Sequence, residues 1–179
     1  MRIVIDTETT GLHPEQGDEI LQLSIIDADT EDVLFNELIR PKKATEWPDA
    51  MAVNNITPEM LKDKPYIEEY APRIRRILSK AHEIIGYNVG FDICFLLCQV
   101  PFCPVHGWYI YDVMREYSQK YAEYDESKQR YKWVKLVEAA AHYNYRWDKY
   151  PPHDALGDVF ATLYVYKRLA YPNLYGGGD

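Results

Sequence analysis

The first carboxylates of the chain stand where a strand would hold them side by side. Residues 3–5 form a β-branched apolar run, typical of a strand buried on both faces, and Asp6-Thr7-Glu8 follows directly. Because side chains alternate along a strand, Asp6 and Glu8 are expected on the same side of it. Two such carboxylates repel each other, and a divalent cation that prefers oxygen ligands, Mg²⁺ or Mn²⁺, removes the conflict. An Asp-x-Glu alone also fits an exposed strand end before the turn at Gly11, so the metal hypothesis needs further acids.

Two later segments supply acids at comparable places. Asn88 to Asp92 follows a short strand predicted at residues 83–87, and an apolar helix is predicted directly after it at residues 93–97. His153-Asp-Ala-Leu-Gly-Asp158 lies at the start of the last predicted helix, with Asp158 just over one turn beyond His153. Ligands of α/β sheets bind at the carboxyl ends of parallel strands, where these acids are expected to converge.

The elements that must position these groups are strands that alternate with helices. Strands are predicted at residues 3–5, 19–26, 33–39, 83–87 and 108–112. Helices are predicted at residues 70–81, 93–97, 132–142 and 154–169, with a further helix start at Thr57-Pro58 and a polar, tyrosine-rich helical stretch at 113–131. This order predicts an α/β fold with a five-stranded mixed sheet, a three-strand antiparallel meander plus two parallel strands, flanked by helices.

Length and composition favour one domain. The 179 residues suffice for a core without disulfides, and we expect the domain to span residues 1–172 with a flexible glycine-rich tail at 173–179. No apolar run has membrane-spanning length, and the polar residues 6–8 interrupt any signal peptide, so no membrane partner is expected. The three cysteines (Cys94, Cys98 and Cys103) form no Cys-x-x-Cys pair and are expected to be buried or half-buried thiols in a reducing cytoplasm.

The charge of the chain limits how it could bind nucleic acid. A net charge of −8 argues against wide wrapping of a duplex, although a narrow cleft filled by metal ions stays possible. Arg73, Arg75, Arg76 and Lys80 are expected to form a solvated helix face, with a phosphate-contacting patch as the alternative. A second basic cluster closes the tyrosine-rich stretch: Lys128, Arg130, Lys132 and Lys135.

Four carboxylates with one histidine resemble the DEDD exonucleases, in the DEDDh branch that includes bacterial proofreading subunits and ribonuclease T. Three segments carry the resemblance, in the family's order and at its usual separations: Asp6-Thr-Glu-Thr-Thr-Gly11, Asn88-Val-Gly-Phe-Asp92 and His153-Asp-Ala-Leu-Gly-Asp158. Residues 53–61 also look like the family's segment before its first helix, although Asn54-Asn55 stands where the family often has histidine or asparagine followed by glycine. The resemblance implies a ribonuclease H-like fold.

The resemblance also assigns roles to residues. Metal ligands would be Asp6, Glu8, Asp92 and Asp158, holding two divalent ions (Mg²⁺ or Mn²⁺) with Asp6 shared between them. Ions roughly 4 Å apart can stabilise both the attacking and the leaving oxygen of an in-line displacement at phosphorus. His153 would be the general base, because imidazole titrates near neutral pH.

Substrate contacts are implied around the first two motifs. Thr10 and Gly11 would present backbone groups to the terminal nucleotide, Leu12 would pack against its base, and Phe91 would wall the pocket or belong to the core. Asn88 would border the site and bond the turn that carries Asp92. Asp154 is expected to cap the last helix. Trp47, Met51 and Asn54 are candidate cleft residues by position only.

The implied activity is metal-dependent 3′–5′ exonuclease hydrolysis of DNA or RNA, which releases nucleoside monophosphates from single-stranded 3′ ends. Proofreading or DNA repair would be its setting, with a DNA polymerase or a second copy of the chain as candidate partners and the cytoplasm as its location. Two alternatives stay open. One is a phosphodiesterase limited to very short oligonucleotides, and the other is a non-catalytic nucleic-acid-binding module of the same fold.

Overall fold

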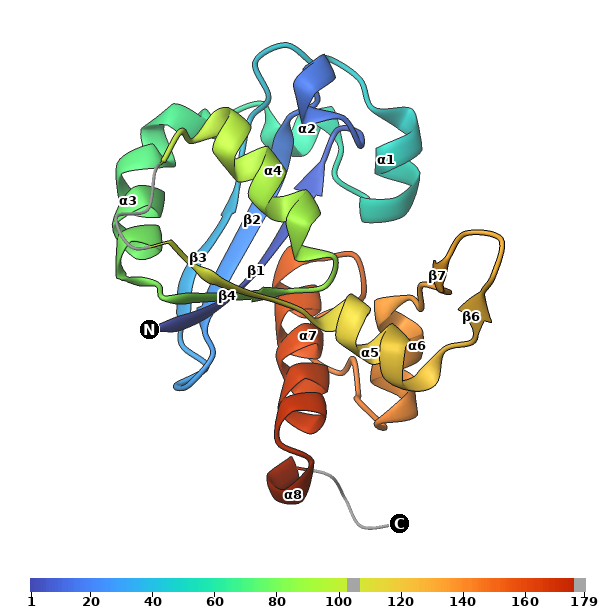
Figure 1. Ribbon diagram of the computed structural model, residues 1–179. Helices are drawn as coiled ribbons and strands as arrows, with labels where there is room; N and C mark the ends of the chain where they lie inside the picture. The colour runs from blue at the N-terminus through green and yellow to red at the C-terminus, as the bar shows by residue number, and fades with distance from the viewer. Residues whose placement is uncertain (103–106, 176–179) are drawn as a thin grey trace.

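The computed structural model describes residues 1–102 and 107–175. Five strands form one mixed sheet in the order β3-β2-β1-β4-β5 (Figure 1). β1 pairs antiparallel with β2, and β2 with β3, whereas β4 is parallel to both β1 and β5. The prediction of a meander plus two parallel strands is therefore confirmed. The strands are β1 (Arg2–Thr9), β2 (Ile20–Asp27), β3 (Val33–Leu38), β4 (Glu83–Gly86) and β5 (Tyr109–Asp112).

Helices cover both faces of this sheet (Figure 1). In chain order they are the 3-10 helix η1 (Pro14–Gln16), α1 (Pro48–Asn54), α2 (Pro58–Leu61), α3 (Ile67–Lys80), α4 (Val89–Gln99), α5 (Val113–Tyr121), α6 (Leu136–His142), α7 (Ala155–Ala170) and α8 (Pro172–Tyr175). A separate two-stranded hairpin, β6 (Tyr124–Asp125) and β7 (Arg130–Tyr131), lies between α5 and α6 in the chain.

The alternation of side chains along β1 divides the core into two layers. Ile3 and Ile5 are buried in a cluster with residues of α3 and α4. Val4, between them in the chain, is buried with residues of α5, α6 and α7 on the opposite face. Asp6 and Glu8 continue the register of Val4, so they lie on the face that α7 covers.

Two helix starts follow the predicted capping residues. The Thr57 side chain accepts a hydrogen bond from the Met60 N–H at the start of α2. The Asp154 carboxylate accepts the N–H groups of Leu156 and Gly157 at 3.0 and 3.2 Å and so caps α7. These bonds satisfy N–H groups that have no partner within the helix.

The predicted helical stretch at 113–131 is wrong beyond Tyr121, where α5 ends and the β6–β7 hairpin begins. The Asp125 carboxylate accepts the N–H groups of Ser127 and Lys128, a local turn that competes with helix formation. Gln129 then adopts a left-handed conformation with φ of 52°. The helix expected at 132–142 begins only at Leu136.

Other differences are smaller. α1 was not predicted, because its N-cap residue, Trp47, offers no capping side chain. Cys94 and Cys98 are exposed, which corrects the expected burial, and Cys103 lies outside the described residues. Residues 173–175 belong to α8, whereas the rest of the predicted tail, 176–179, is not described.

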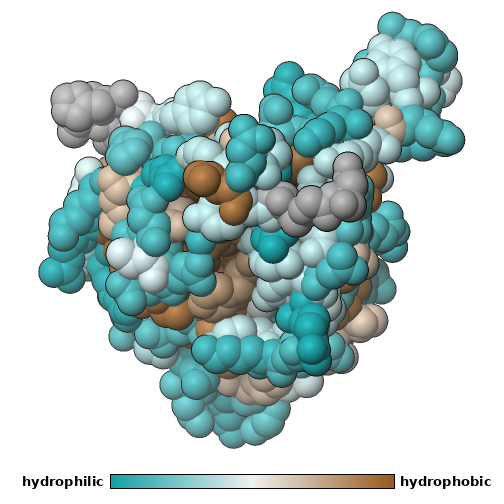
Figure 2. Space-filling view, turned by 90° about the horizontal axis from the view of Figure 1, so that it is seen from below, coloured by the Kyte–Doolittle hydropathy of each residue, from teal (hydrophilic) through white to brown (hydrophobic). Residues whose placement is uncertain are grey.

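None of the helices in the described ranges combines the length and apolar character needed to cross a membrane. The face seen from below is largely hydrophilic, with hydrophobic residues in a few separate patches (Figure 2).

Candidate active site

The carboxylates at the end of β1 meet one from α7. Asp6 and Glu8 lie opposite Ser24 and Gln22 of β2 and are half-buried. One carboxylate oxygen from each of Asp6, Glu8 and Asp158 lies within 4.8 Å of the other two. The structure therefore brings together acids that are 150 residues apart in the sequence, and this cluster is of a size that one divalent cation could occupy.

Asp92 approaches the same strand from α4. Its carboxylate is buried, with 3% of the residue exposed, and it accepts a hydrogen bond of 2.7 Å from the Thr7 hydroxyl. Thr7 lies between Asp6 and Glu8 and points to the opposite face of β1. The fourth predicted acid is thus held at the same strand end, although it is not a member of the three-carboxylate cluster.

Burial raises the pKa values of all four acids, and repulsion from other members of the set adds to the effect for Asp6 and Glu8. For Asp6, burial raises the pKa well above its usual range, and the charges of Asp92 and Asp158 add to the effect. Burial and the charge of Asp158 raise the pKa of Glu8 to about 8. Burial raises the pKa of Asp92 and of Asp158 to about 7 each. Four acids that resist ionisation together are electrostatically suited to a cation, which would favour their charged forms.

A buried amide joins the start of α7 to the sheet. Gln22 of β2 donates to a carboxylate oxygen of Asp154 at 3.4 Å and accepts the Ala155 N–H at 3.3 Å. It also donates to the side chain of Asn36 at 3.2 Å. The first turn of α7, which carries Asp158, is fixed by these bonds to the strand that neighbours Glu8. Sequence reasoning did not find Gln22, because nothing in a lone glutamine predicts a partner 133 residues away.

His153 lies just before α7, and its backbone contacts Asp158 of the acidic cluster. It is exposed and has a left-handed backbone, with φ of 61°. Its N–H donates to Asp158 at 3.3 Å, while its imidazole makes no hydrogen bond or ion pair within the described residues. The ring is thus free to meet a group that enters from solvent.

A pocket of about 470 Å³ adjoins the cluster. Three predicted substrate-contacting residues after β1 line it, and so does Phe91 of α4, whereas Asn88 does not. Leu12 is 71% exposed at its edge. The full lining is Thr7, Glu8, Thr9, Thr10, Gly11, Leu12, Asp49, Ala50, Val53, Asn54 and Phe91. The pocket thus runs from the carboxylates to an exposed apolar side chain.

The residues predicted by position alone to line the cleft, and Asn88, have mixed outcomes. Asn54 lines the pocket and its amide donates to the Thr9 carbonyl at 3.4 Å, whereas Trp47 and Met51 pack in a separate apolar cluster. Asn88 contributes its backbone, whose carbonyl accepts the Phe91 N–H at 2.9 Å, and its side chain makes no capping bond.

The Asp18 carboxylate lies so close to the backbone of Gly11 that this position has no room for a side chain. A Cβ at this position would lie 2.3 Å from the Asp18 carboxylate, so a larger residue would displace it. That carboxylate accepts the His13 N–H at 2.8 Å and lies 3.3 Å from the Thr10 hydroxyl, which donates to it. Asp18 therefore shapes the loop that leads to Leu12, a role that its position in a polar loop did not reveal.

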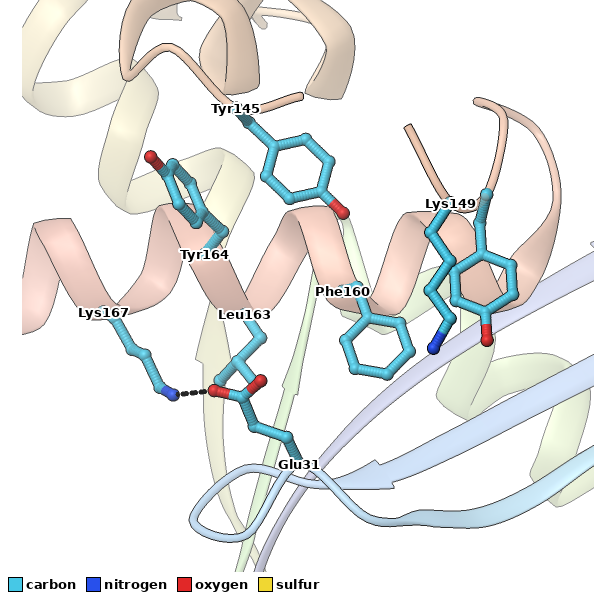
Figure 3. A pocket seen from close by; sticks show the side chains of 8 residues that line it. Glu31, Tyr145, Lys149, Phe160, Leu163, Tyr164 and Lys167 are labelled. Atoms are coloured by element: carbon cyan, nitrogen blue, oxygen red, sulfur yellow. Dashed lines mark hydrogen bonds and ion pairs between the residues drawn. The ribbon is translucent and has the colours of Figure 1, made fainter. Parts of the chain in front are cut away.

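A second pocket, of about 310 Å³, lies on another side of α7 (Figure 3). Aromatic rings line it, and its one carboxylate, Glu31, is paired with Lys167 at 2.6 Å. The acidic cluster and this pocket share no residue.

Comparison with known proteins decides the family. The RNase_T family, described as exonuclease, matches residues 3–166. The chain belongs to this family of DEDDh exonucleases. It is 31% identical over 176 residues to an uncharacterized exonuclease, CP81, of Escherichia phage 186, with 94% of this chain and 88% of that protein aligned.

Polymerase subunits are also among the relatives of this exonuclease-family chain. It is 34% identical over 100 residues to the DNA polymerase III subunit epsilon of Treponema pallidum. That alignment covers 55% of this chain but only 45% of the epsilon subunit, so the chain matches less than half of such a relative.

Solved structures confirm the ribonuclease H-like exonuclease fold. Exonuclease X in complex with 5′-overhanging duplex DNA matches with a TM-score of 0.64 and 22% identity, over 99% of this chain and 95% of that one. E. coli Exonuclease I in complex with a dA16 oligonucleotide matches with a TM-score of 0.71 and 21% identity, over 98% and 42%.

Proposed function

We propose that this chain is a 3′–5′ exonuclease that hydrolyses the terminal phosphodiester of a single-stranded 3′ end and releases nucleoside monophosphates. The observation that carries the proposal is the cluster of Asp6, Glu8 and Asp158 at the end of the central strand, within an exonuclease-family fold. The adjoining pocket is large enough for a nucleotide.

Two divalent cations, Mg²⁺ or Mn²⁺, are the proposed cofactors. The donor set fits them, because it consists of carboxylates whose raised pKa values mark an uncompensated negative site. Asp6, Glu8 and Asp158 would hold one ion, and Asp6 with Asp92 the other. Bound there, the ions would polarise the phosphodiester and stabilise charge on the attacking and leaving oxygens.

His153 is the proposed general base. Its imidazole takes a proton from water as the water oxygen bonds to phosphorus, and the bond from phosphorus to the 3′-oxygen of the penultimate nucleotide breaks. The free, exposed imidazole is compatible with this role, because it need not break an internal bond to act. The hydrogen bond from the His153 N–H to the Asp158 carboxylate holds the backbone of His153 beside the cluster.

The terminal nucleotide would lie in the pocket beside the cluster. Backbone groups of Thr10 and Gly11 would contact its sugar and phosphate, Leu12 would pack on the base, and Phe91 would form the wall. Asn88 would contribute only by shaping the turn before Phe91.

A digestion panel tests the proposal. Single- and double-stranded DNA and RNA, labelled at the 5′ end, should be shortened in Mn²⁺ or Mg²⁺ to a ladder with mononucleotides as the other product. Asp6→Asn should abolish turnover, and Asp63→Asn, which removes an exposed acid away from the site, should not. Turnover of a dinucleotide but not of longer strands would identify a short-oligonucleotide phosphodiesterase instead. Metal-independent binding without any turnover would identify a binding module.

The proposed cellular role follows from the kinds of relatives that the chain has. Because the relatives include polymerase III epsilon subunits, proofreading beside a DNA polymerase is the proposed role, with repair as its nearest alternative, in the cytoplasm. Gel filtration alone and with a DNA polymerase would separate a free enzyme, a homodimer and a polymerase-bound subunit.

A further inference from the structure

The segment from Lys120 to Lys135 differs in charge from the rest of the chain. It carries five basic and three acidic side chains in a protein whose net charge is −8. The β6–β7 hairpin that it contains projects from the molecule beyond α5 and α6 (Figure 1). We call residues 120–135 the basic hairpin segment.

Several aromatic side chains on this segment are exposed, and one of them has a cation over its ring. Trp133 is 59% exposed, and the Arg130 guanidinium lies over its ring at 3.9 Å from the centroid. Tyr124 and Tyr131 are also exposed and pack edge to face across the hairpin at 5.2 Å. Exposed rings beside cations are the combination that binds single-stranded nucleic acid, by stacking on bases and contact with phosphates.

Several of these cations are available to a ligand. Lys132 and Lys128 pair with acids of the same segment, at 2.5 Å from Glu123 and 3.8 Å from Asp125. Within the described residues, Arg130 and Lys135 form no ion pair. The exposed ion pairs of Lys132 and Lys128 are weak, so both lysines could exchange their carboxylate partners for a phosphate.

The base of the segment is bonded to the residues that lead into α4 and to α5. The Val134 carbonyl accepts the Tyr87 hydroxyl at 2.8 Å, and its N–H donates to the Ser118 hydroxyl at 3.4 Å. Tyr87 precedes the turn at Asn88, from which α4 carries Phe91 into the pocket wall. The projecting hairpin and the pocket are therefore connected through one short, bonded stretch.

We infer that the basic hairpin segment binds the single strand upstream of its 3′ end, with bases stacked on Trp133 and phosphates beside Arg130. This inference rests on the proposed exonuclease function. It assigns a role to a segment outside the acidic cluster, and it predicts that affinity depends on strand length.

Binding without catalysis gives the first test. The probe is a 5′-fluorescein-labelled oligothymidylate of about 20 nucleotides, followed by anisotropy in EDTA at low salt, with a blunt duplex of the same length as comparison. Trp133→Ala and Arg130→Gln should each raise the Kd for the single strand by about fivefold or more. The Kd for the duplex should change less, because its bases are already stacked.

Matched controls come from α8 and from α3. Tyr175→Ala removes another exposed aromatic ring that has a cation over it, Lys167 at 5.7 Å. Arg76→Gln removes another exposed arginine. Both should leave the Kd for the single strand unchanged, and thermal melts should show all four variants folded.

Steady-state hydrolysis separates this inference from the proposed function. For the long strand, Trp133→Ala should raise KM and leave kcat unchanged, whereas neither constant should change for a dinucleotide. If the wild type hydrolyses nothing, the exonuclease proposal fails, yet the anisotropy results still decide strand binding. An unchanged Kd in both hairpin variants, or an equal loss on the duplex, would overturn the inference.

Discussion

The side-chain carbonyl of Gln22 accepts the backbone N–H of Ala155, at 3.3 Å, across 133 residues of sequence. The same amide donates to Asp154, so one side chain of the sheet satisfies both the cap residue and the first N–H of α7. Because α7 begins between His153 and Asp158, the position of the proposed base relative to the acids depends on this contact.

Gln22→Met should therefore lower kcat strongly while the protein stays folded. The methionine keeps the volume but leaves a buried N–H and the Asp154 carboxylate without the amide, at a cost of about 1–3 kcal/mol. We expect Tm to fall by several degrees and kcat by about tenfold or more, since small displacements of catalytic groups are costly. Tyr164→Phe, also in α7, is the control, because it removes a 3.1 Å bond to the carbonyl of Tyr143, the residue after α6, away from the site. An equal loss of kcat in the control would contradict the positioning role.

The metal-free protein should become less stable as the pH rises. The pKa of Glu8 is raised from 4.5 to about 8, and those of Asp92 and Asp158 from 3.8 to about 7. In the window between these values the native state binds more protons than the unfolded chain, so the free energy of unfolding falls with increasing pH.

Thermal melts in EDTA from about pH 5 to about pH 8 measure this slope. Glu8→Gln should flatten it, and Mn²⁺ should restore stability most at the alkaline end, where the carboxylates are charged. A Tm that is constant or rises over this range in EDTA would contradict the burial and repulsion of these acids.

Removing the imidazole of His153 should slow turnover without unfolding the chain. Asparagine is the better replacement than alanine, because it tolerates the left-handed backbone at this position, where φ is 61°. His153→Asn should lower kcat by about 10²- to 10⁴-fold near neutral pH, the usual contribution of a positioned base. The control is His82→Asn, an exposed histidine beside the N-terminus. Activity within a few-fold of the wild type would exclude His153 as the base.

Leu12 should affect binding of the terminal nucleotide. It is 71% exposed at the pocket edge, so its truncation removes apolar contact with a bound base without opening a cavity in the core. Leu12→Ala should raise KM by about 3- to 10-fold, as expected for the loss of a partly buried leucine surface. Leu174→Ala, on α8, removes a leucine that is 77% exposed and should have no effect. Initial rates on a short single strand provide the comparison.

The sequence predicted the sheet and the proximity of Asp6, Glu8 and Asp158, for identifiable reasons. Strand alternation placed Asp6 and Glu8 on one face, and capping chemistry placed Asp154 at the start of α7. These signals are local. The contacts of Gln22 with Asp154 and of Thr7 with Asp92 are formed by polar residues far apart in the chain, so no local pattern predicts them.

The hairpin was missed for a different reason. Tyr124 and Tyr131 pair across a turn whose left-handed residue is Gln129, where glycine or asparagine would have signalled a hairpin. A polar, tyrosine-containing stretch without such a signal is compatible with a helix. The exposed pair of Arg130 and Trp133 emerges only when the turn is known.

Asp92 and Asp158 reach the end of β1 from helices that pack on opposite faces of the sheet. A ligand held by both would connect the two helical layers directly, at this edge of the sheet. Amide hydrogens of α4 and α7 should then exchange more slowly together when cations are added, although no residue of one helix needs to contact the other. Through these acids, the rigidity of both helical layers would depend on the concentration of divalent cations.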